Sequence, residues 1–557
     1  MQVRHLGRNG LIKIFMGHFM RQIKLLDCTL RDGAYIVDSI FGDSSIKGII
    51  KKLQDADVDI IECGWLKDKP HEKGSSFFHV PEDVIPYFVE RKEGKEYVAM
   101  IDWDRYNLDI LPQYDGNSID AIRVVFPYNK FHDGIDVGKK VKEKGYTLYF
   151  QAANTLAYSN DDLEILANEV NASGAKSLSV VDTFGAMYEE DLDRIVTVLD
   201  SKLNQDIAIG FHSHNNQQLA FSNAIHFIKL LDKSQRTIVV DSSLCGMGRG
   251  AGNATTELMV NYLNKKYDSG YSMNAIMDAI DIYMKHFEEQ FKWGYSTEYC
   301  IAGMYCCHVN NIAYLTKNHR TSSKDMRNII ESLSPEDRKK YDYDLLEIKY
   351  IENQNRKVDD SVSFIRLKTE FANKKIVLIA PGKTSVSEKS KVDSFIRDNR
   401  KDVVVIATNA LLDEYDHQYD YLFLTNYARY EYAKETKTNQ FESVKKILLS
   451  SVKRDADKDE YVIEFERAIK RGWEHFDNAV ICCLRLLKLL EVKDIYIAGF
   501  DGFKGSHNES YADTALPTVN PGKKWEELNE EIKEMFDDIK KSSSDQNIYF
   551  LTESLYE

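Results

Sequence analysis

The chain has 557 residues, of which 43% are hydrophobic and 29% charged, a composition typical of a globular protein. This length exceeds one ordinary hydrophobic core and predicts two or three domains. The formal net charge of −15 argues against a general binder of nucleic acid or anionic membranes, and no apolar run approaches the roughly 18 residues of a transmembrane helix.

The first segment, residues 1–22, is basic and contains no acidic residue, and we expect it to form an N-terminal extension. Lys13 and His18 interrupt its apolar part and no small-residue cleavage site follows, which argues against a signal peptide. A short amphipathic membrane anchor is the alternative. The eight cysteines include no C-x-x-C spacing, so we expect reduced thiols in a cytoplasmic protein instead of disulfides or a zinc site.

Short β-rich runs then recur every 20–40 residues, with segments of helical spacing between most of them. Eight such units over residues 23–264 predict a (β/α)8 TIM barrel, with a doubly wound sheet as the alternative. The predicted strands are 23–28, 59–65, 97–103, 121–127, 147–152, 177–182, 207–214 and 237–244.

The rest of the chain changes pattern twice. Residues 265–365 are mostly helical in spacing and rich in tyrosine and charge, and we expect an all-α appendage that covers the barrel mouth. A new α/β rhythm starts at KIVLIAPGKTS and continues through DVVVIATNAL, YDYLFLTN, KKILLSS and KDIYIAGFDG. These five strands predict a separate Rossmann-like α/β domain over residues 373–557.

Polar clusters follow three of the predicted barrel strands. Arg31 and Asp32 follow the first strand, His212 and His214 end the seventh, and the glycine-rich CGMGRGAGN after the eighth ends in Asn253. The carboxyl ends of barrel strands meet at one mouth, and residues i and i+2 of a strand share a face. Two imidazoles and a carboxylate form a mixed N/O site for a divalent metal. Each element alone is compatible with a structural role.

Three motifs in this order resemble the DRE-TIM metallolyase superfamily. They are D-x-T-L-R-D-G, H-S-H-N-N and G-x-G-R-G-A-G-N, and the resemblance covers residues 23 to about 330. The superfamily includes 4-hydroxy-2-oxovalerate aldolase, hydroxymethylglutaryl-CoA lyase and isopropylmalate synthase.

The resemblance implies a role for each matching position. A divalent metal, Mn2+ or Mg2+, would chelate an α-keto acid, and Arg31 would stabilise the enolate oxygen that forms when the C–C bond breaks or forms. Asp182 and Thr183, after the sixth strand, would line the substrate pocket, and Glu62 would bind substrate or support the site from behind. The implied metal ligands are Asp32, His212 and His214, with Asn253 in or near the coordination shell.

One position departs from the aldolase pattern. Where those aldolases place a histidine acid/base, this chain has Tyr35, and a free phenol titrates near pH 10, so it is a poor base. Tyr35 fits a proton donor, with His71, His79 or a metal-bound water as alternatives. WGYSTEYCIAGMYCCHVNN resembles the helical region that supplies a tyrosine to the aldolase site, for which Tyr305 is the nearest match and Tyr299 the second. The alternative is an aromatic core between helices.

The C-terminal segment lacks the G-x-x-x-x-G-K-[ST] motif and any G-x-G-x-x-G. Its strand-end turns at Gly382 and Asn409 loosely resemble the nucleotide-binding turns of sialyltransferase-like and pterin-pyrophosphokinase-like domains. A nucleotide or nucleotide-sugar ligand is therefore predicted, and a partner-binding, channelling or purely structural domain is the alternative.

Together these features predict a metal-dependent carbon–carbon lyase of the aldolase type. It would act on an α-keto acid and an aldehyde through a pyruvate-type enolate, with the aldehyde linked to a nucleotide or sugar. The alternatives are an acyl-CoA-dependent lyase or condensing enzyme, and a glycosyl- or nucleotidyl-transferase with the barrel as scaffold. We expect a homo-oligomer, although the sequence does not specify the number of subunits.

Overall fold

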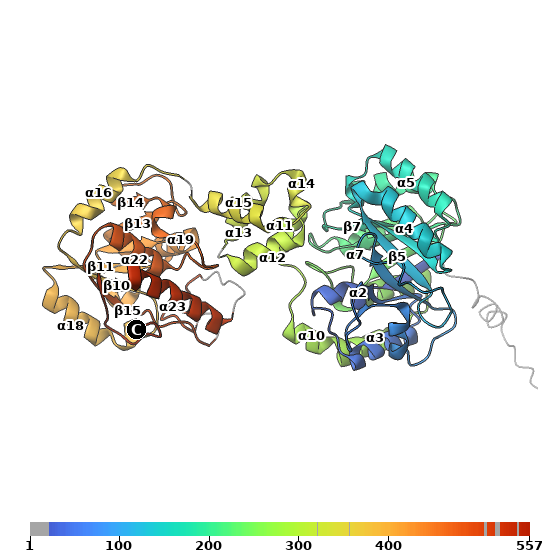
Figure 1. Cartoon of the computed structure of the whole chain (residues 1–557), viewed down its shortest axis with the longest axis horizontal. Coiled ribbons are helices and arrows are strands. Elements are labelled where there is room, and N and C mark those ends of the chain that lie inside the picture. Colours follow the sequence, from blue (N-terminus) through green and yellow to red (C-terminus); the bar gives the residue numbers. More distant parts are fainter. Residues whose placement is uncertain (1–21, 320, 356, 506–508, 518–523, 543–544) are drawn as a thin grey trace, which may run out of the picture. The chain divides into compact units, whose positions relative to one another are not determined.

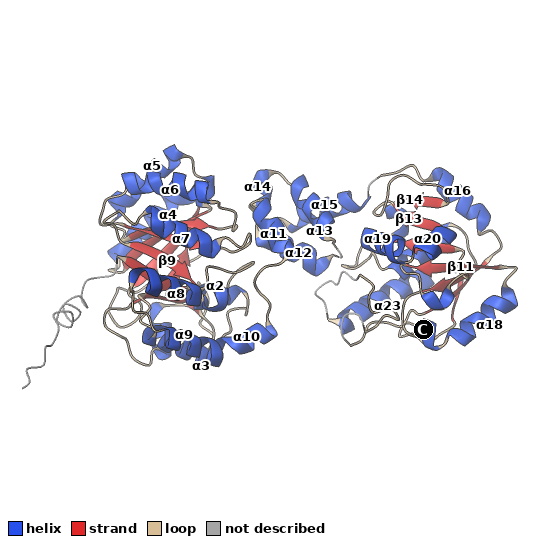
Figure 2. Cartoon of the chain, turned by 180° about the vertical axis from the view of Figure 1, so that it is seen from behind, coloured by secondary structure: helices blue, strands red, loops and turns tan. Residues whose placement is uncertain are grey.

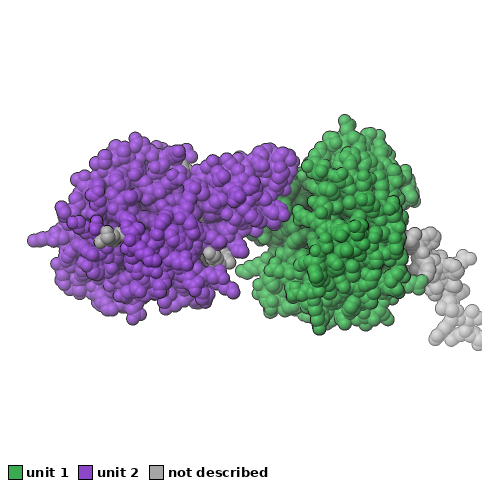
Figure 3. Space-filling model, viewed as in Figure 1, with its two compact units in different colours: residues 1–309 green, residues 310–557 purple. Residues whose placement is uncertain are grey.

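The computed structural model describes residues 22–319, 321–355, 357–505, 509–517, 524–542 and 545–557. The predicted extension lies outside this part of the chain except for its last residue, Gln22. The chain divides into two compact units, residues 1–309 and 310–557 (Figure 3). In the described ranges, we find no helix with both the length and the apolar character needed to cross a membrane.

The first unit is a closed barrel of eight parallel strands, which confirms the predicted fold class (Figures 1 and 2). Strand β1 pairs with both β9 and β2, and this double pairing closes the sheet and rules out the doubly wound alternative. A two-residue strand, β3 (Phe77–Phe78), adds to the edge of β2. The barrel strands are β1 (Ile23–Asp27), β2 (Ile60–Leu66), β4 (Glu96–Asp102), β5 (Ala121–Pro127), β6 (Thr147–Ala153), β7 (Ser177–Asp182), β8 (Ala208–Ser213) and β9 (Ile238–Ser242).

Amphipathic helices surround these strands and bury one apolar face each against them (Figure 2). In α5 the Ser159 hydroxyl accepts a hydrogen bond from the backbone N–H of Asp162, and Gly174 ends the helix at a φ of 73°. The surrounding helices are α3 (Asp43–Asp55), α4 (Phe131–Glu143), α5 (Asn160–Ser173), α6 (Glu189–Lys202), α7 (Ala220–Leu230) and α8 (Thr256–Tyr267). The unit continues through α9 (Met273–Ala279), the π-helical η6 (Ile280–Met284), α10 (Lys285–Gln290) and α11 (Thr297–Met304).

The predicted helical appendage, residues 265–365, spans parts of both units. Helices α9 to α11 belong to the first unit, whereas the second unit opens with five helices, of which the last, α16, packs against β14. These are α12 (Val309–Asn318), α13 (Ser323–Ser332), α14 (Pro335–Arg338), α15 (Tyr343–Asn355) and α16 (Ser361–Glu370). The predicted covering of the barrel mouth by this region stays a prediction.

The second unit contains a parallel sheet of seven strands in the order β14-β13-β12-β11-β10-β15-β16. The five predicted strands are present, and the sequence pattern missed β14 (Glu460–Ile463) and β16 (Asn547–Phe550), which are four residues long and form the two edges. The other strands are β10 (Lys375–Ile379), β11 (Val403–Thr408), β12 (Tyr421–Leu424), β13 (Lys445–Leu449) and β15 (Asp494–Ala498). The helices between them are α17 (Thr384–Ser387), α18 (Lys389–Asn399), α19 (Tyr427–Thr436), α20 (Thr438–Ser443), α21 (Phe465–Ala468), α22 (Ala479–Leu489) and α23 (Trp525–Ser542).

Candidate metal and catalytic site

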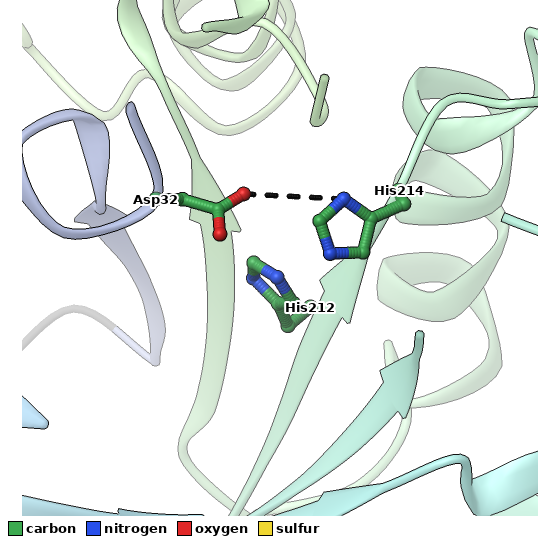
Figure 4. A group of neighbouring side chains, drawn as sticks. All are labelled: Asp32, His212 and His214. Atoms are coloured by element: carbon green, nitrogen blue, oxygen red, sulfur yellow. Dashed lines mark ion pairs between the residues drawn. The ribbon is translucent and has the colours of Figure 1, made fainter. Parts of the chain in front are cut away.

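Three buried side chains meet at the carboxyl ends of the barrel strands. Asp32 ends the short helix α2 (Thr29–Asp32) after β1, His212 lies in β8 and His214 follows it (Figure 4). One oxygen of Asp32 and one nitrogen of each histidine lie within 4.8 Å of one another. This spacing is close to the span of ligands that share one divalent cation.

The charge states of these groups suit a cation. The Asp32 carboxylate accepts hydrogen bonds from Arg31 Nη1 (2.7 Å) and Asn253 Nδ2 (2.7 Å). Burial alone would raise the pKa of Asp32, but Arg31 and the two imidazoles outweigh it and hold that pKa well below its usual range. Burial lowers the pKa of His214 to about 4, against the opposing charge of Asp32, so the imidazole is neutral at neutral pH. Ionised carboxylate and neutral imidazole are the metal-binding forms.

Two further observations show that the donor set fits a metal. The Oδ1 atom of Asn253 is buried and has no hydrogen-bond partner among the described residues, so an oxygen ligand is available beside Asp32. His212 contacts the Asp241 carboxylate through Nδ1 at 3.1 Å, which leaves Nε2 for an ion. A carboxylate behind a ligating histidine is the usual arrangement in metal sites.

The glycine-rich loop after β9 gives Asn253 room to approach. A Cβ atom at Gly248 would collide with Asn253 Nδ2 and Asp32 Oδ2, so only glycine fits beside these groups. Gly252 has a φ of 83°, and a Cβ there would collide with the Gly246 carbonyl. The loop therefore supports the candidate metal site structurally.

Arg31 and His212 are linked by a buried chain of alternating charges. The Arg31 Nε donates to Glu62 Oε2 at 2.8 Å, and Arg123 Nη1 lies 2.9 Å from the same oxygen. Arg123 also donates to Asp241 Oδ2 at 2.5 Å, and Asp241 contacts His212. The structure therefore places Glu62 behind Arg31, where it orients the guanidinium. Arg31 keeps one nitrogen, Nη2, that is buried and has no partner in the described chain.

The sequence analysis missed Arg123 and Asp241. Both are charged residues inside otherwise apolar strands, β5 and β9, and are no more than 2% exposed. Charged side chains are almost never buried this deeply unless they are paired, so their position in the strands was the available clue.

Asp182 and Thr183 end β7 and connect the loops around the mouth. The Asp182 carboxylate accepts hydrogen bonds from the backbone N–H groups of Ala186 (2.8 Å) and Met187 (3.2 Å), and burial raises its pKa to about 7. The Thr183 hydroxyl accepts from the Asn154 N–H at 2.7 Å. Their predicted contact with substrate stays a prediction.

Tyr35 lies in a cluster of aromatic and cationic side chains. It ends the short helix η1 (Gly33–Tyr35), and the guanidinium carbon of Arg249 lies 3.9 Å from its ring centre. The Trp65 ring packs against Tyr35 edge-on with centroids 6.1 Å apart, and Lys67 Nζ lies 4.0 Å from the Trp65 ring. Burial raises the pKa of Tyr35, only partly opposed by Arg249, so the phenol is protonated at neutral pH.

His308 is a further residue that the sequence analysis missed. It follows α11, and burial together with the nearby charges of Arg249 and His214 lowers its pKa to about 3. Its imidazole is therefore neutral at neutral pH. It lies in the WGYSTEYCIAGMYCCHVNN segment, where the analysis had considered only the tyrosines.

The remaining candidates near the barrel occupy other positions. Tyr305 is half-buried at the C-cap of α11, and Tyr299 lines a groove beside Cys245 and Trp293. Both ring nitrogens of His71 contact the chain, at the Phe77 carbonyl (2.8 Å) and the Tyr87 hydroxyl (3.1 Å), so His71 has no free nitrogen for proton transfer. His79 contacts the Lys67 carbonyl at 3.3 Å.

In the second unit the structure brings the two predicted ligand-binding turns together. Gly382 follows β10 and Asn409 follows β11, and both line one recess at the carboxyl ends of these strands.

Comparisons with known proteins bear on the barrel. Residues 131–282 match the model of the HMGL-like family. Oxaloacetate decarboxylase of Mycobacterium tuberculosis is 24% identical over 268 residues, which cover 46% of this chain and 75% of that protein. A 4-hydroxy-2-oxovalerate aldolase of Geobacillus genomosp. 3 is 27% identical over 269 residues, covering 46% and 76%. The solved HMG-CoA lyase of Brucella melitensis is 15% identical with a TM-score of 0.39, covering 49% of this chain and 99% of that one.

The family model and these relatives are thus those of carbon–carbon lyases and aldolases. They support the resemblance of the first unit to the DRE-TIM superfamily that its three motifs indicate.

Proposed function

We propose that this protein is a divalent-metal-dependent aldolase or lyase that makes or breaks a C–C bond next to an α-keto acid through a pyruvate-type enolate. One observation carries the proposal. The Arg31 guanidinium donates a hydrogen bond to Asp32 through Nη1, while its buried Nη2 has no partner among the described residues. Asp32 in turn lies within metal-ligand distance of His212 and His214. A fixed cationic donor and a cation site therefore adjoin one another where negative charge can develop.

Asp32, His212, His214 and the Oδ1 of Asn253 would hold Mn2+ or Mg2+. When bound, such an ion supplies Lewis-acid polarisation of a keto oxygen. In the proposed reaction, Arg31 donates a hydrogen bond to that oxygen as it becomes an enolate. Glu62 and Asp32 keep the guanidinium in place, so little reorganisation is needed at that moment.

Two groups fit the proton transfers. His308 is neutral at neutral pH and would accept the proton, from an acceptor-derived hydroxyl in the cleavage direction or from the pyruvate methyl group in the exchange reaction. Its pKa of about 3 makes it a weak base, so the group that gives up the proton would have to be made more acidic by the bound metal and by Arg31. Tyr35 is protonated and would donate a hydrogen bond to the acceptor oxygen. Asp182 and Thr183 would line the keto-acid pocket, and Tyr305 would contact the acceptor.

The predicted partner of the α-keto acid is an aldehyde, and more specifically an aldehyde linked to a nucleotide or a sugar. An acyl-CoA lyase that used the thiol of Cys245, in the glycine-rich loop, is disfavoured. Burial raises the pKa of this thiol far above neutral pH, so the reactive thiolate is not formed. The buried donor cluster counts against a barrel that serves only as a scaffold for transferase chemistry, because buried charge is costly without a use.

The proposal predicts that the Mg2+-loaded protein exchanges the methyl protons of pyruvate with D2O, followed by 1H NMR. Asp32→Asn removes the central carboxylate and should abolish both exchange and Mn2+ binding, measured by EPR. Asp278→Asn changes an exposed carboxylate in α9 and should leave both unchanged. Absence of exchange in the wild-type protein, with release of free CoA from an acyl-CoA, would replace this proposal by the acyl-CoA alternative.

A further inference from the structure

The second unit contains a recess at the point where the strand order of its sheet changes direction. From β10 the chain adds β11 to β14 on one side of the sheet and then β15 and β16 on the other. The strand order therefore reverses between β10 and β15, and open parallel sheets bind ligands at the carboxyl ends of the strands beside such a point. The residues that line this recess include Gly382, Thr408, Asn409, Arg429, Asn478 and Asp501.

One buried hydroxyl in this recess lacks a partner. Thr408 ends β11 and is fully buried, and its Oγ1 has no hydrogen-bond partner among the residues that the structure describes. Buried polar groups in native proteins are nearly always hydrogen-bonded, so an unpartnered hydroxyl on the wall of a recess indicates a ligand.

Two side-chain amides add donors beside it. The Oδ1 of Asn409 accepts from the Thr425 N–H at 3.2 Å, and the Oδ1 of Asn478 accepts from the Val480 (3.1 Å) and Ile481 (3.2 Å) N–H groups. With their oxygens engaged, both side chains offer NH2 donors. The wall therefore combines three potential donor groups.

The charge of the recess favours an anion. Arg429 from α19 is 5% exposed and lies on the wall, with its guanidinium carbon 5.2 Å from the Tyr511 ring centre. The 11-residue helix α22 begins at the recess, and helix N-termini attract negative charge. Asp501 also lines the recess. Its carboxylate accepts hydrogen bonds from the N–H (2.8 Å) and the hydroxyl of Thr384, and these two donors partly offset its negative charge.

Size and surroundings narrow the class of anion. The cavity volume of about 70 Å³ has room for a phosphate-sized group, and the recess is open on one side, so an attached nucleoside would extend toward the opening. Four aromatic side chains line the recess: Phe503 and Tyr511, which are half-buried and form its aromatic wall, and Phe500 and Tyr556, which are buried behind them. Phe503 is also stacked on Trp525, with centroids 5.4 Å apart. Aromatic faces of this kind bind planar bases by stacking.

The close approach of the two loops depends on a glycine. A Cβ at Gly382 would collide with the Gly499 carbonyl and would lie 2.7 Å from Asp501 Cγ. The Gly382 N–H donates to that same carbonyl at 3.0 Å. Gly382 therefore shapes the recess.

We propose that the second unit binds a nucleoside phosphate here, with its phosphate against Thr408, Arg429 and the start of α22 and its base on the aromatic wall. This site is separate from the proposed lyase chemistry and does not depend on it.

Isothermal titration of the full-length chain with AMP, GMP, CMP and UMP tests the proposal, with the matching nucleosides and inorganic phosphate as controls. We expect at least one nucleotide to bind at least tenfold more tightly than its nucleoside and than phosphate. Thr408→Val keeps the side-chain shape and should weaken nucleotide binding about tenfold. Arg429→Gln should weaken it further, whereas Thr369→Val, which removes an exposed hydroxyl in α16, should not change it.

Failure of all four nucleotides to bind would overturn the proposal, as would unchanged binding in Thr408→Val. Phosphate binding as tightly as any nucleotide would overturn the assignment of the aromatic wall to a base. The pyruvate exchange rate of the same samples reports on the barrel independently, so failure of one proposal is distinguishable from failure of the other.

Discussion

Arg31→Lys is the substitution that separates enolate stabilisation from metal binding. The three nitrogens of the Arg31 guanidinium differ in their contacts. Nε donates to Glu62 at 2.8 Å, Nη1 donates to Asp32 at 2.7 Å, and Nη2 has no partner in the described chain. Lysine keeps the charge but has a single ammonium, which the two carboxylates would engage. The free donor aimed at substrate would be lost.

The expected loss follows from this count of donors. Removal of one donor to a developing oxyanion costs about 2.7–4 kcal/mol, or about 100- to 1000-fold in kcat. We expect the methyl-proton exchange of pyruvate in D2O with Mg2+ to slow by that factor in Arg31→Lys. Mn2+ affinity by EPR should change less than about tenfold, because Asp32 and both histidines remain.

Arg91→Lys is the matched control. Arg91 also contacts a carboxylate, Asp120 at 2.5 Å, but Asp120 precedes β5 and so lies at the amino end of the barrel strands, away from the site. The Arg91→Lys variant should exchange the methyl protons of pyruvate at the wild-type rate. Exchange by Arg31→Lys within threefold of wild type, with metal bound, would refute the role of the free Nη2. A parallel loss of Mn2+ binding would instead assign the effect to Asp32.

Four further predictions concern the surroundings of the metal site and the pH dependence of stability. Asp241→Asn removes the charge behind His212 and should weaken Mn2+ binding about 10- to 100-fold by EPR titration, and unchanged affinity would show that the buried charge chain does not support the ligand. Gly248→Ala should also weaken Mn2+ binding, because its Cβ would collide with Asn253 and Asp32, and a wild-type affinity would contradict the close approach of the loop. His308→Gln should slow pyruvate exchange about 100-fold or more while Mn2+ still binds, and an unchanged rate would remove His308 from the proton transfer. Because the pKa of His308 is lowered to about 3, this side chain binds a proton in the unfolded chain but not in the folded one below about pH 6.5, so its contribution to stability falls with pH, whereas the raised pKa of Asp182 (about 7) acts in the opposite direction. Urea unfolding of the metal-free protein at pH 7 and pH 5 measures the His308 contribution as a difference between variants: the free energy of unfolding of His308→Gln should fall less, or rise more, from pH 7 to pH 5 than that of the wild type, and an equal change would contradict this reasoning.

Local patterns in the sequence were sufficient for the barrel and for the core of its site. The eight apolar runs are short and regularly spaced, and the structure contains a strand at each of them. Asp32, His212 and His214 stand directly at or after strand ends, where the carboxyl ends of barrel strands must meet. Their proximity follows from topology, so no side-chain detail was needed to predict it. Gly382 and Asn409 were predicted from a resemblance alone, and the structure brings them to one recess in the second unit.

Other features depended on packing between segments that are far apart in the chain. Arg123 and Asp241 are joined across 118 residues, and neither has a motif that marks it as the support of Arg31 and His212. The edge strands β14 and β16 are too short for a distinct pattern, and each forms against a neighbour that is already in place.

By itself, then, the sequence determined the barrel topology and the gathering of Asp32, His212 and His214 at its mouth, because strand order and strand ends are encoded locally. Only the tertiary structure decided which nitrogen of Arg31 is free, how the charges behind it connect and that His308 lies beside Arg249. These features arise from burial, which brings distant side chains into a low-dielectric interior where each charge must find a partner.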